Sequence, residues 1–231
     1  MPTVTDVLAR LRFSARLLIH PAQQRHFIPW LRSQRSDYLL RVGLPWLCFD
    51  AIAALDRLDL RGWRVFEYGS GGSTLYWLRR GASVVSVEHD ATWYARVRTL
   101  TPPDAPLDYR LALPEPAQPG PVDPSDPAAY HSGDPAYAGY SFARYAAEID
   151  AFPQEYFDLV LVDGRARPSC MLHALPRVRR GGLLILDNSD RAYYTARIGP
   201  LLADWRATVY AGAAPGAPVL TRTTFYVRAE V

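Results

Sequence analysis

Several short runs of aliphatic residues along the chain are not interrupted by polar side chains. Such runs are typical of strands buried on both faces, where the alternation of apolar and polar positions is lost. Segments with helical spacing of apolar residues lie between them, so the pattern predicts a mostly parallel sheet covered by helices on both sides. The uninterrupted runs lie within Phe157–Val162 and Leu183–Leu186, and the shorter apolar runs in Trp63–Tyr68 and Ser83–Val87 are expected to form two further strands.

Further segments complete the expected fold. Apolar positions at helical spacing predict helices over Val4–Ile19, Leu44–Leu58, Ala91–Leu100, Ser169–Arg180 and near Tyr193–Leu202. Additional strands are expected over Leu107–Leu113, Arg206–Ala211 and Thr221–Val227. We therefore predict one α/β domain with a doubly wound sheet over residues 61–231, preceded by an N-terminal helical extension or cap over residues 1–60.

Residues 101–136 break this regular pattern. They contain ten prolines and few aliphatic residues, which disfavours regular structure and predicts a long loop or lid. A tolerated surface insertion would have the same composition. Aromatic side chains gather at and just after the end of the segment, and this density is uncommon in a purely solvated loop. We therefore favour a partly ordered lid that shapes substrate choice.

The first aliphatic run leads into a glycine-rich loop. The loop lies within Glu67–Thr74, and Thr74 stands where dinucleotide-binding loops have a third glycine. A strand, a glycine loop and a helix beginning near Ser73 allow close backbone approach to a ligand. Glu88 ends the next strand, at the spacing where an acidic side chain accepts hydrogen bonds from ribose hydroxyls. The carboxylate of Glu67 would repel a pyrophosphate, but it suits a ligand that carries an ammonium and a sulfonium group.

These features resemble the class I S-adenosylmethionine-dependent methyltransferases, whose first motif has the form acidic-x-Gly-x-Gly-x-Gly and whose second strand ends in an acidic residue. Ser73 stands at the last motif glycine. The resemblance implies a seven-stranded Rossmann-like sheet with one antiparallel strand and S-adenosylmethionine as cofactor. It places Glu67 and the loop around the methionine part, Glu88 on the ribose and Leu113–Glu115 near adenine. The cofactor-binding residues are then Glu67, Tyr68, Gly69, Ser70, Gly71, Gly72, Glu88, His89 and Asp163.

Two later strands also end in polar residues. Asp163 and the pair Asp187-Asn188 each follow a predicted strand, so they should share one edge of the sheet. They resemble the oxygen ligands of the divalent-metal-dependent O-methyltransferases. This implies Mg²⁺ or another divalent cation that lowers the pKa of a substrate hydroxyl. That family has a lysine three residues after the first aspartate, where this chain has Ala166. A strand-end aspartate without metal and an ordinary Asp-Asn turn are the alternative interpretations.

Histidines and arginines near the same edge suggest proton transfer and anion binding. His89 and His131 have a side-chain type whose pKa suits a general base, although a lone histidine is more often structural. Arg165 and Arg167 follow Asp163 directly, where they would either hold an anionic substrate group or pair with nearby carboxylates. The candidate catalytic residues are Asp163, Asp187, His89 and His131.

Composition narrows the enzyme classes. All 26 basic residues are arginine, which excludes a Walker-type phosphate loop, a pyridoxal Schiff base and a lysine general base. Cys48 and Cys170 lie in apolar stretches and are expected to be reduced core residues. The sequence shows neither an apolar run long enough to span a membrane nor a cleavable signal segment, so a cytoplasmic location is expected.

Arginines are concentrated near the N-terminus, although the formal net charge is only +3. They alternate with apolar positions that predict a basic amphipathic helix over Val4–Ile19. Such a helix packs on its own domain more often than on an anionic membrane or an acidic partner, so we expect packing, with peripheral membrane contact as the alternative. Its apolar positions are Val4, Val7, Leu8, Leu11, Ala15 and Leu18.

The favoured function is methyl transfer from S-adenosylmethionine to an oxygen of a small molecule or of a sugar- or lipid-linked acceptor. Oxygen is favoured by the strand-end acids and by the absence of an Asn-Pro-Pro-Tyr signature of nitrogen methyltransferases. A nucleic-acid acceptor is disfavoured by the small net charge and the lack of an aromatic platform. The alternatives are a non-catalytic S-adenosylmethionine-binding module and a nicotinamide-dependent oxidoreductase, which would need the third loop glycine.

Overall fold

The computed structural model describes residues 4–118, 120 and 122–230. Residues 1–3 of the predicted cap lie outside the described residues, as do residues 119 and 121 of the predicted Pro-rich lid and residue 231 of the predicted main domain. The strands of the main sheet are β1 (Arg64–Tyr68), β2 (Ser83–Glu88), β3 (Leu107–Leu111), β6 (Phe157–Val162), β7 (Val178–Asp187), β8 (Trp205–Ala213) and β9 (Leu220–Arg228). A separate short pair is β4 (Glu115–Pro116) and β5 (Tyr140–Ser141).

The main sheet of the described residues has seven strands in the order β3-β2-β1-β6-β7-β9-β8. β9 runs antiparallel to β7 and β8, and the other neighbouring strands are parallel. This topology confirms the predicted doubly wound sheet with one antiparallel strand. Because the order reverses between β1 and β6, the carboxyl ends of these two strands border a crevice where ligands bind in open α/β sheets.

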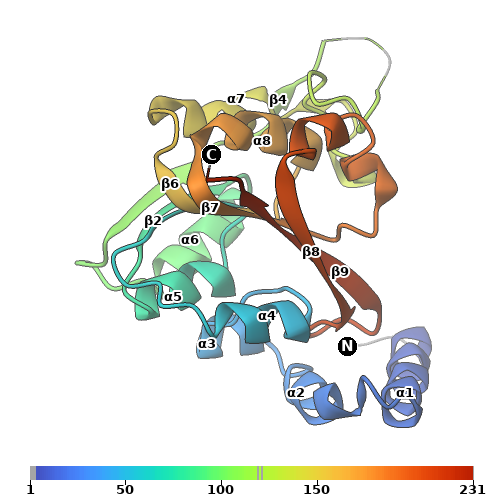
Figure 1. The fold of residues 1–231 in the computed structure, drawn as a ribbon. Helices are drawn as coiled ribbons and strands as arrows, with labels where there is room; N and C mark the ends of the chain where they lie inside the picture. The colour runs from blue at the N-terminus through green and yellow to red at the C-terminus, as the bar shows by residue number, and fades with distance from the viewer. Residues whose placement is uncertain (1–3, 119, 121, 231) are drawn as a thin grey trace.

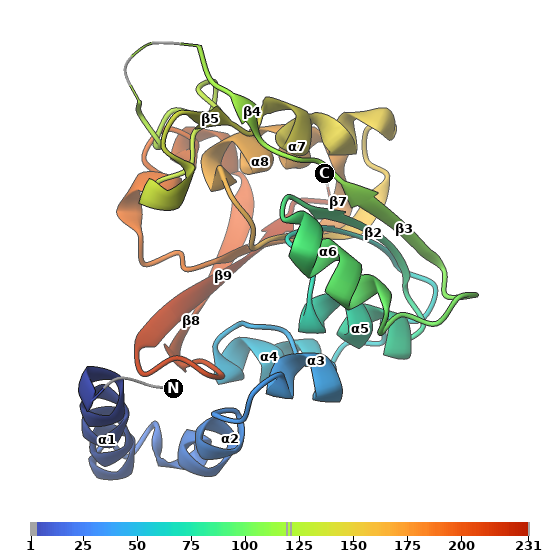
Figure 2. The same cartoon turned by 180° about the vertical axis from the view of Figure 1, so that it is seen from behind.

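Helices cover both faces of the sheet (Figures 1 and 2), with α7 and α8 on one side and α4 and α5 on the other. The helices are α1 (Val4–Ile19), α2 (Phe27–Arg32), α3 (Tyr38–Val42), α4 (Phe49–Leu55), α5 (Gly72–Arg79), α6 (Ala91–Arg98), α7 (Ala143–Ala147) and α8 (Arg167–Ala174). Short 3-10 helices lie between these elements, at residues 24–26, 135–137, 148–151, 175–177, 192–194 and 199–202. None of the described helices is long and apolar enough to cross a membrane.

Successive residues of β1 bury their side chains on opposite faces, as the pleat of a strand requires. Val65 belongs to a core with Trp77 of α5 on one face. Phe66 belongs to a second core with Tyr145 of α7 and Met171 of α8 on the other. Burial on both faces explains why this strand and its neighbours are continuous aliphatic runs in the sequence.

Several predicted boundaries are wrong near prolines and glycines. The helix expected over Ser169–Arg180 ends at Ala174, and Pro176 lies in the 3-10 turn that follows. β7 then begins at Val178, inside the predicted helix, and includes Gly181 and Gly182. The segment near Tyr193–Leu202 forms two 3-10 turns, with Pro200 in the second, instead of one α-helix. Proline lacks the N–H that a continuing helix needs, which accounts for these interruptions.

Helix α1 packs through a different face from the one predicted. Phe13 and Leu17 are buried with Trp30, where the ring centroids of Phe13 and Trp30 lie 5.2 Å apart. The apolar stripe expected to face the domain remains outside, and its exposed members include Val7, Leu8, Leu11 and Leu18. Contact of this exposed stripe with a membrane or a partner stays a prediction.

Gly72, the first residue of α5, lies directly against the backbone of the N-terminal segment. A Cβ atom at this position would overlap the carbonyl oxygen of Leu44 and lie 2.9 Å from that of Leu39. Backbone carbonyls cannot rotate away as a side chain does. The segment that leads from α3 to α4 therefore packs against the beginning of α5. This close approach is possible because Gly72 has no side chain.

Replacing Gly72 with alanine is expected to lower the free energy of unfolding by about 1–3 kcal/mol, because the added methyl group overpacks this contact. Urea denaturation followed by circular dichroism measures the change. Gly199→Ala is the matched control, since a Cβ atom there meets no atom within 4 Å. An equal loss of stability in the two variants would contradict the close packing.

Candidate functional site

A cavity of about 1130 Å³ opens at the carboxyl ends of β1, β2, β6 and β7. The glycine loop and the residues that follow these strands form one part of its wall. The N-terminal segment between Ser33 and Leu40, together with Trp46, forms a second part. Residues between Ala214 and Thr221, at the β8–β9 hairpin, form a third part. Segments from both ends of the described chain therefore enclose the site.

The structure brings most of the predicted strand-end residues to this cavity. Glu88, Asp163, Asp187 and Asn188 all line it, as the parallel sheet requires. Four loop residues predicted to bind a cofactor also line it, namely Gly69, Ser70, Gly71 and Gly72. Two predicted residues, Glu67 and Tyr68, do not belong to its wall.

Glu67 is fully buried beneath the loop. Ser86 Oγ and Trp77 Nε1 donate hydrogen bonds to its carboxylate at 2.7 and 3.1 Å, and Thr74 Oγ1 donates a short one. Thr74 Oγ1 also accepts from the backbone N–H of Gly71 at 3.0 Å, so the chain from β1 to the loop is held by two linked bonds. Burial raises the pKa of Glu67, and these donors oppose the rise. The direct ligand contact predicted for Glu67 is therefore corrected: its carboxylate fixes the shape of the loop.

Tyr68 and the Leu113–Glu115 segment also lie away from the cavity. Tyr68 is completely buried in the core on the opposite face, where its hydroxyl donates to the carbonyl of Ala146 at 2.7 Å. Tyr68 follows Glu67 in a strand, and adjacent strand side chains point to opposite faces. Glu115 begins β4, which pairs with β5 and carries this segment away from the predicted adenine position. Neither prediction of direct cofactor contact is supported by the structure.

Glu88 is the acidic residue that faces the glycine loop. One carboxylate oxygen accepts from the backbone N–H and the hydroxyl of Ser70 at 3.0 and 2.9 Å. The other accepts from the backbone N–H groups of His89 and Asp90 at 2.8 and 2.9 Å. Burial opposes ionisation of Glu88, but the His89 side chain and these N–H groups outweigh it and lower its pKa. Glu88 is thus an ionised acceptor held rigidly at the end of β2.

Two aromatic residues that the sequence analysis did not single out complete this side of the site. Trp93 in α6 lines the cavity, and its Nε1 donates to the carbonyl oxygen of Ser70 at 2.8 Å. The Tyr109 hydroxyl lies 2.6 Å from Ser70 Oγ. The only sequence signal for Trp93 is its place in the helix that follows Glu88. Its ring offers a flat surface beside the loop on which a planar ring can stack.

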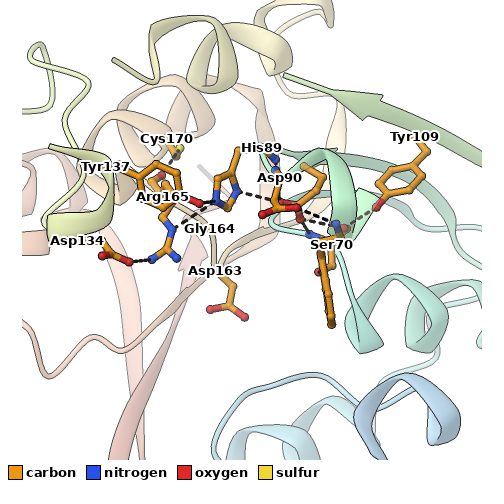
Figure 3. A network of polar contacts seen from close by, with 12 residues as sticks. Ser70, His89, Asp90, Tyr109, Asp134, Tyr137, Asp163, Gly164, Arg165 and Cys170 are labelled. Atoms are coloured by element: carbon orange, nitrogen blue, oxygen red, sulfur yellow. Dashed lines mark hydrogen bonds and ion pairs between the residues drawn. The ribbon is translucent and has the colours of Figure 1, made fainter. Parts of the chain in front are cut away.

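His89 links the end of β2 to the segment that precedes β5 (Figure 3). Its Nε2 lies 2.9 Å from the Tyr137 hydroxyl and 3.4 Å from Arg165 Nε, and its Nδ1 lies 2.9 Å from Glu88 Oε1. Arg165 in turn pairs with Asp134 at 2.9 Å. Nε2 is thus engaged by Tyr137 and Arg165, whereas Nδ1 lies close to Glu88 but is buried without a hydrogen-bond partner among the described residues. The contacts of Nε2 favour a connecting role for His89 over that of a general base.

His131 does not meet His89. It lines a second cavity of about 400 Å³, formed by residues between Pro124 and Pro135, the turn Gly164–Pro168, and Arg191 with the tyrosines that follow. Its Nδ1 atom is buried and has no hydrogen-bond partner among the described residues. The end of the predicted Pro-rich lid is therefore part of a cavity wall beside the main site.

The guanidinium of Arg167 contacts both strand-end aspartates. Its Nη2 lies 3.0 Å from Asp163 Oδ1, and its Nη1 lies 3.9 Å from Asp187 Oδ2. It also donates to the carbonyl oxygen of Gly164 at 3.0 Å, and its side chain is 8% exposed. Ala166 adopts φ 44°, an uncommon left-handed conformation for a residue with a side chain, in the turn that leads into α8. This local turn brings Arg167 back over the strand ends.

The two aspartates form one buried acidic pair around this cation. Burial raises the pKa of Asp163 well above its ordinary value, the charge of Asp187 adds to the rise, and Arg167 opposes it. Burial also raises the pKa of Asp187, while Arg167 and a 2.6 Å hydrogen bond from the Thr223 hydroxyl oppose it. Asp163 thus combines an ion pair with a position on the cavity wall.

The residues present do not fit the predicted divalent cation at Asp163, Asp187 and Asn188. The guanidinium of Arg167 already supplies a positive charge to both carboxylates, and a dication added beside it would be repelled. The amide nitrogen of Asn188 donates to Thr221 Oγ1 at 3.0 Å. Within the described residues, no group of three or more His, Cys, Asp and Glu side chains is arranged to hold a metal ion. We correct the metal prediction accordingly.

No protein-family model matches the sequence, and no curated protein matches it. Solved structures do match over almost the whole chain. A putative O-methyltransferase from Klebsiella pneumoniae is 20% identical, with a TM-score of 0.58 over 95% of this chain and 99% of that one. The O-methyltransferase TomG from Streptomyces achromogenes, in complex with S-adenosylmethionine, is 16% identical, with a TM-score of 0.56 over 95% and 98%.

An O-methyltransferase from Bacillus cereus, in complex with S-adenosylhomocysteine, is also similar. It is 16% identical, with a TM-score of 0.52 over 99% of this chain and 92% of that one. Likeness at this level of identity establishes the fold. The chain has the fold of the class I S-adenosylmethionine-dependent methyltransferases.

Replacing Arg167 with methionine is expected to destabilise the protein by about 3–5 kcal/mol at pH 8, because two buried carboxylates lose their cation. The pKa values of Asp163 and Asp187 already lie above those of the unfolded chain, and they rise further in the variant. The folded variant then binds more protons than the unfolded chain. Its stability therefore falls as pH rises from about 4 toward these raised values, and the deficit is smaller at pH 5 than at pH 8.

Urea denaturation at the two pH values measures this difference. Arg61→Met is the matched control, because Arg61 pairs with the exposed Asp59 and its own side chain is 82% exposed. It should change stability by less than about 0.5 kcal/mol at either pH. An Arg167→Met deficit that does not depend on pH would show that the aspartates do not need this guanidinium.

Proposed function

We propose that the protein is an S-adenosylmethionine-dependent methyltransferase that acts on an oxygen of a small molecule or of a sugar- or lipid-linked acceptor. One observation carries the proposal. In a sheet of the methyltransferase order, the large cavity is bordered at once by the glycine loop, by the ionised Glu88 and by the buried carboxylate of Asp163. The fold, shared with O-methyltransferases of known structure, supports the choice of an oxygen acceptor.

The charge of the cavity suits this cofactor. Its wall contains six carboxylates and four arginines, so the acidic groups are in excess. S-adenosylmethionine carries a sulfonium and an ammonium group, and a cationic ligand is favoured there by simple electrostatics. Each oxygen of Glu88 already accepts two hydrogen bonds, so a ribose hydroxyl would take the place of the Ser70 hydroxyl on this carboxylate. Trp93 provides an aromatic surface beside the loop for the adenine ring.

The same residues account for the reaction. The acceptor oxygen attacks the methyl carbon, the carbon–sulfur bond breaks, and S-adenosylhomocysteine leaves with the electron pair on sulfur. Asp163 lines the cavity and takes the proton that the acceptor hydroxyl loses. Arg167 orients Asp163 through their 3.0 Å contact and opposes the rise of its pKa. Most of the rate then comes from holding the two reactants in line.

Calorimetric titration with S-adenosylhomocysteine tests the cofactor site directly. We expect micromolar binding to the unmodified protein, and a loss of at least about tenfold in Glu88→Gln, which keeps the size of the side chain but loses its charge. Glu115→Gln is the matched control, because Glu115 is exposed on β4 and lies outside the cavity. Absence of binding to the unmodified protein would refute the proposal.

Transfer of a labelled methyl group to a panel of phenolic and sugar acceptors tests the chemistry. Asp163→Asn is expected to lower turnover by about 100-fold or more, since the proton acceptor is lost, while S-adenosylhomocysteine affinity stays within about threefold. Asp204→Asn, at an exposed position away from the cavity, is the control. Turnover should also survive EDTA, because the positive charge beside the two aspartates is already supplied by Arg167. Full turnover in Asp163→Asn would exclude Asp163 as the base.

A further inference from the structure

The second cavity shares its wall with the first. Gly164, Arg165, Arg167 and Arg191 line both of them, so a ligand in the main cavity lies next to the smaller one. The smaller cavity of about 400 Å³ is large enough for a compact substituent of a ligand, and His131 lies in its wall with a buried nitrogen that lacks a partner among the described residues. An adjoining compartment of this size indicates that the acceptor has two parts.

The two cavities differ in the sign of their charge. The large one has six carboxylates against four arginines, whereas the small one has three arginines against a single carboxylate, Asp134. Arg167 and Pro168, the first residues of α8, and the preceding Ala166 also border the small cavity, and the amino end of a helix adds partial positive charge. One compartment thus suits a cation, and its neighbour suits an anion.

Two of the three arginines already have acidic partners. Arg167 is committed to Asp163 and Asp187, and Arg165 pairs with Asp134 at 2.9 Å. Both arginines were expected from the sequence to hold a substrate anion or to pair with carboxylates, and the geometry shows the pairing.

Arg191 is different. Among the described residues it makes no ion pair, and the carboxylate of the adjacent Asp190 accepts instead from Thr221 and from the backbone of Arg222. The Tyr194 ring lies between two cations: its centroid is 5.2 Å from Arg167 Cζ and 5.7 Å from Arg191 Cζ. The Tyr194 hydroxyl accepts a hydrogen bond of 2.7 Å from Arg191 Nη1, which holds the guanidinium at the cavity wall. The two guanidinium groups are neighbours, and only that of Arg167 is paired with carboxylates. A bound anion would therefore lower the repulsion between them and neutralise the charge of Arg191.

We infer that the small cavity binds an oxyanionic group of the methyl acceptor, of the phosphate, sulfate or carboxylate class, with Arg191 as its main ligand. This inference rests on the proposed function, which supplies the reacting oxygen and the cofactor in the large cavity. The acceptor is then held at its charged end by Arg191, and its hydroxyl is directed toward Asp163. Such a two-point arrangement selects acidic acceptors over neutral analogues of the same shape.

The test uses inorganic phosphate as the probe and the arginine Nε–Hε signals of the ¹⁵N-labelled full chain as the readout. We expect one saturable set of shifts, with an affinity that falls by about tenfold or more in Arg191→Gln. Arg206→Gln is the matched control, since Arg206 is exposed and lies outside both cavities. Equal phosphate affinity in Arg191→Gln and the unmodified protein, or no saturable shift at all, would overturn the inference.

A parallel titration with S-adenosylhomocysteine separates this inference from the proposed function. Because Arg191 lines both cavities, the affinity for S-adenosylhomocysteine in Arg191→Gln should fall, but by less than about threefold, against the loss of about tenfold or more expected for phosphate in the small cavity. If S-adenosylhomocysteine binds and phosphate does not, the anion site is refuted and the methyltransferase proposal stands. If phosphate binds and S-adenosylhomocysteine does not, the methyltransferase proposal fails, and with it the assignment of the anion to a methyl acceptor.

Discussion

Burial of acidic side chains at one edge of the sheet is the constraint on which the rest of the site depends. Glu67 and Asp187 are almost inaccessible, and Asp163 is mostly covered, so each needs a compensating donor or cation within the protein. Hydrogen bonds from Thr74, Ser86 and Trp77 compensate Glu67 and, through Thr74, shape the glycine loop. Arg167 compensates the aspartate pair by contacting both carboxylates. Neutral hydrogen-bond donors therefore stabilise Glu67, whereas a positive charge stabilises the aspartate pair.

The sequence predicted the fold best for the strands of the sheet that are buried along their length. Continuous aliphatic runs predicted the strands, and the parallel arrangement then placed Glu88, Asp163 and Asp187 on one edge. The sequence could not show which acid faces the ligand, since Glu67 and Glu88 occupy similar strand ends. Their orientation depends on neighbours such as Ser86 and Trp77, which come from other elements. The role of Arg167 was equally hidden, because it depends on the left-handed turn at Ala166.

The site is also divided by charge, and the division follows from chain connectivity. Five of the six carboxylates of the large cavity come from strand ends and the loops that directly follow them, and the sixth, Asp37, comes from the N-terminal segment. The basic compartment comes from the turn after β6, from the segment after β7 and from the end of the Pro-rich stretch. Strand-end positions are fixed by the sheet, whereas the residues of connecting loops are free to vary. The acidic part of the site is thus built mostly on the rigid part of the fold, and the basic part is built on its loops.

The cavity wall joins segments from opposite ends of the chain. The side chain of Gln23 accepts a hydrogen bond from the backbone of Ala213 at 3.0 Å, and Trp30 Nε1 donates to Ala217 at 2.8 Å. These contacts span nearly 190 residues, so they belong to the slow, non-local part of folding. During synthesis the glycine loop and β2 emerge early, but the enclosure around them remains open until the β8–β9 hairpin has left the ribosome. A ribosome-bound intermediate would therefore hold the ligand-binding motif without a closed binding site.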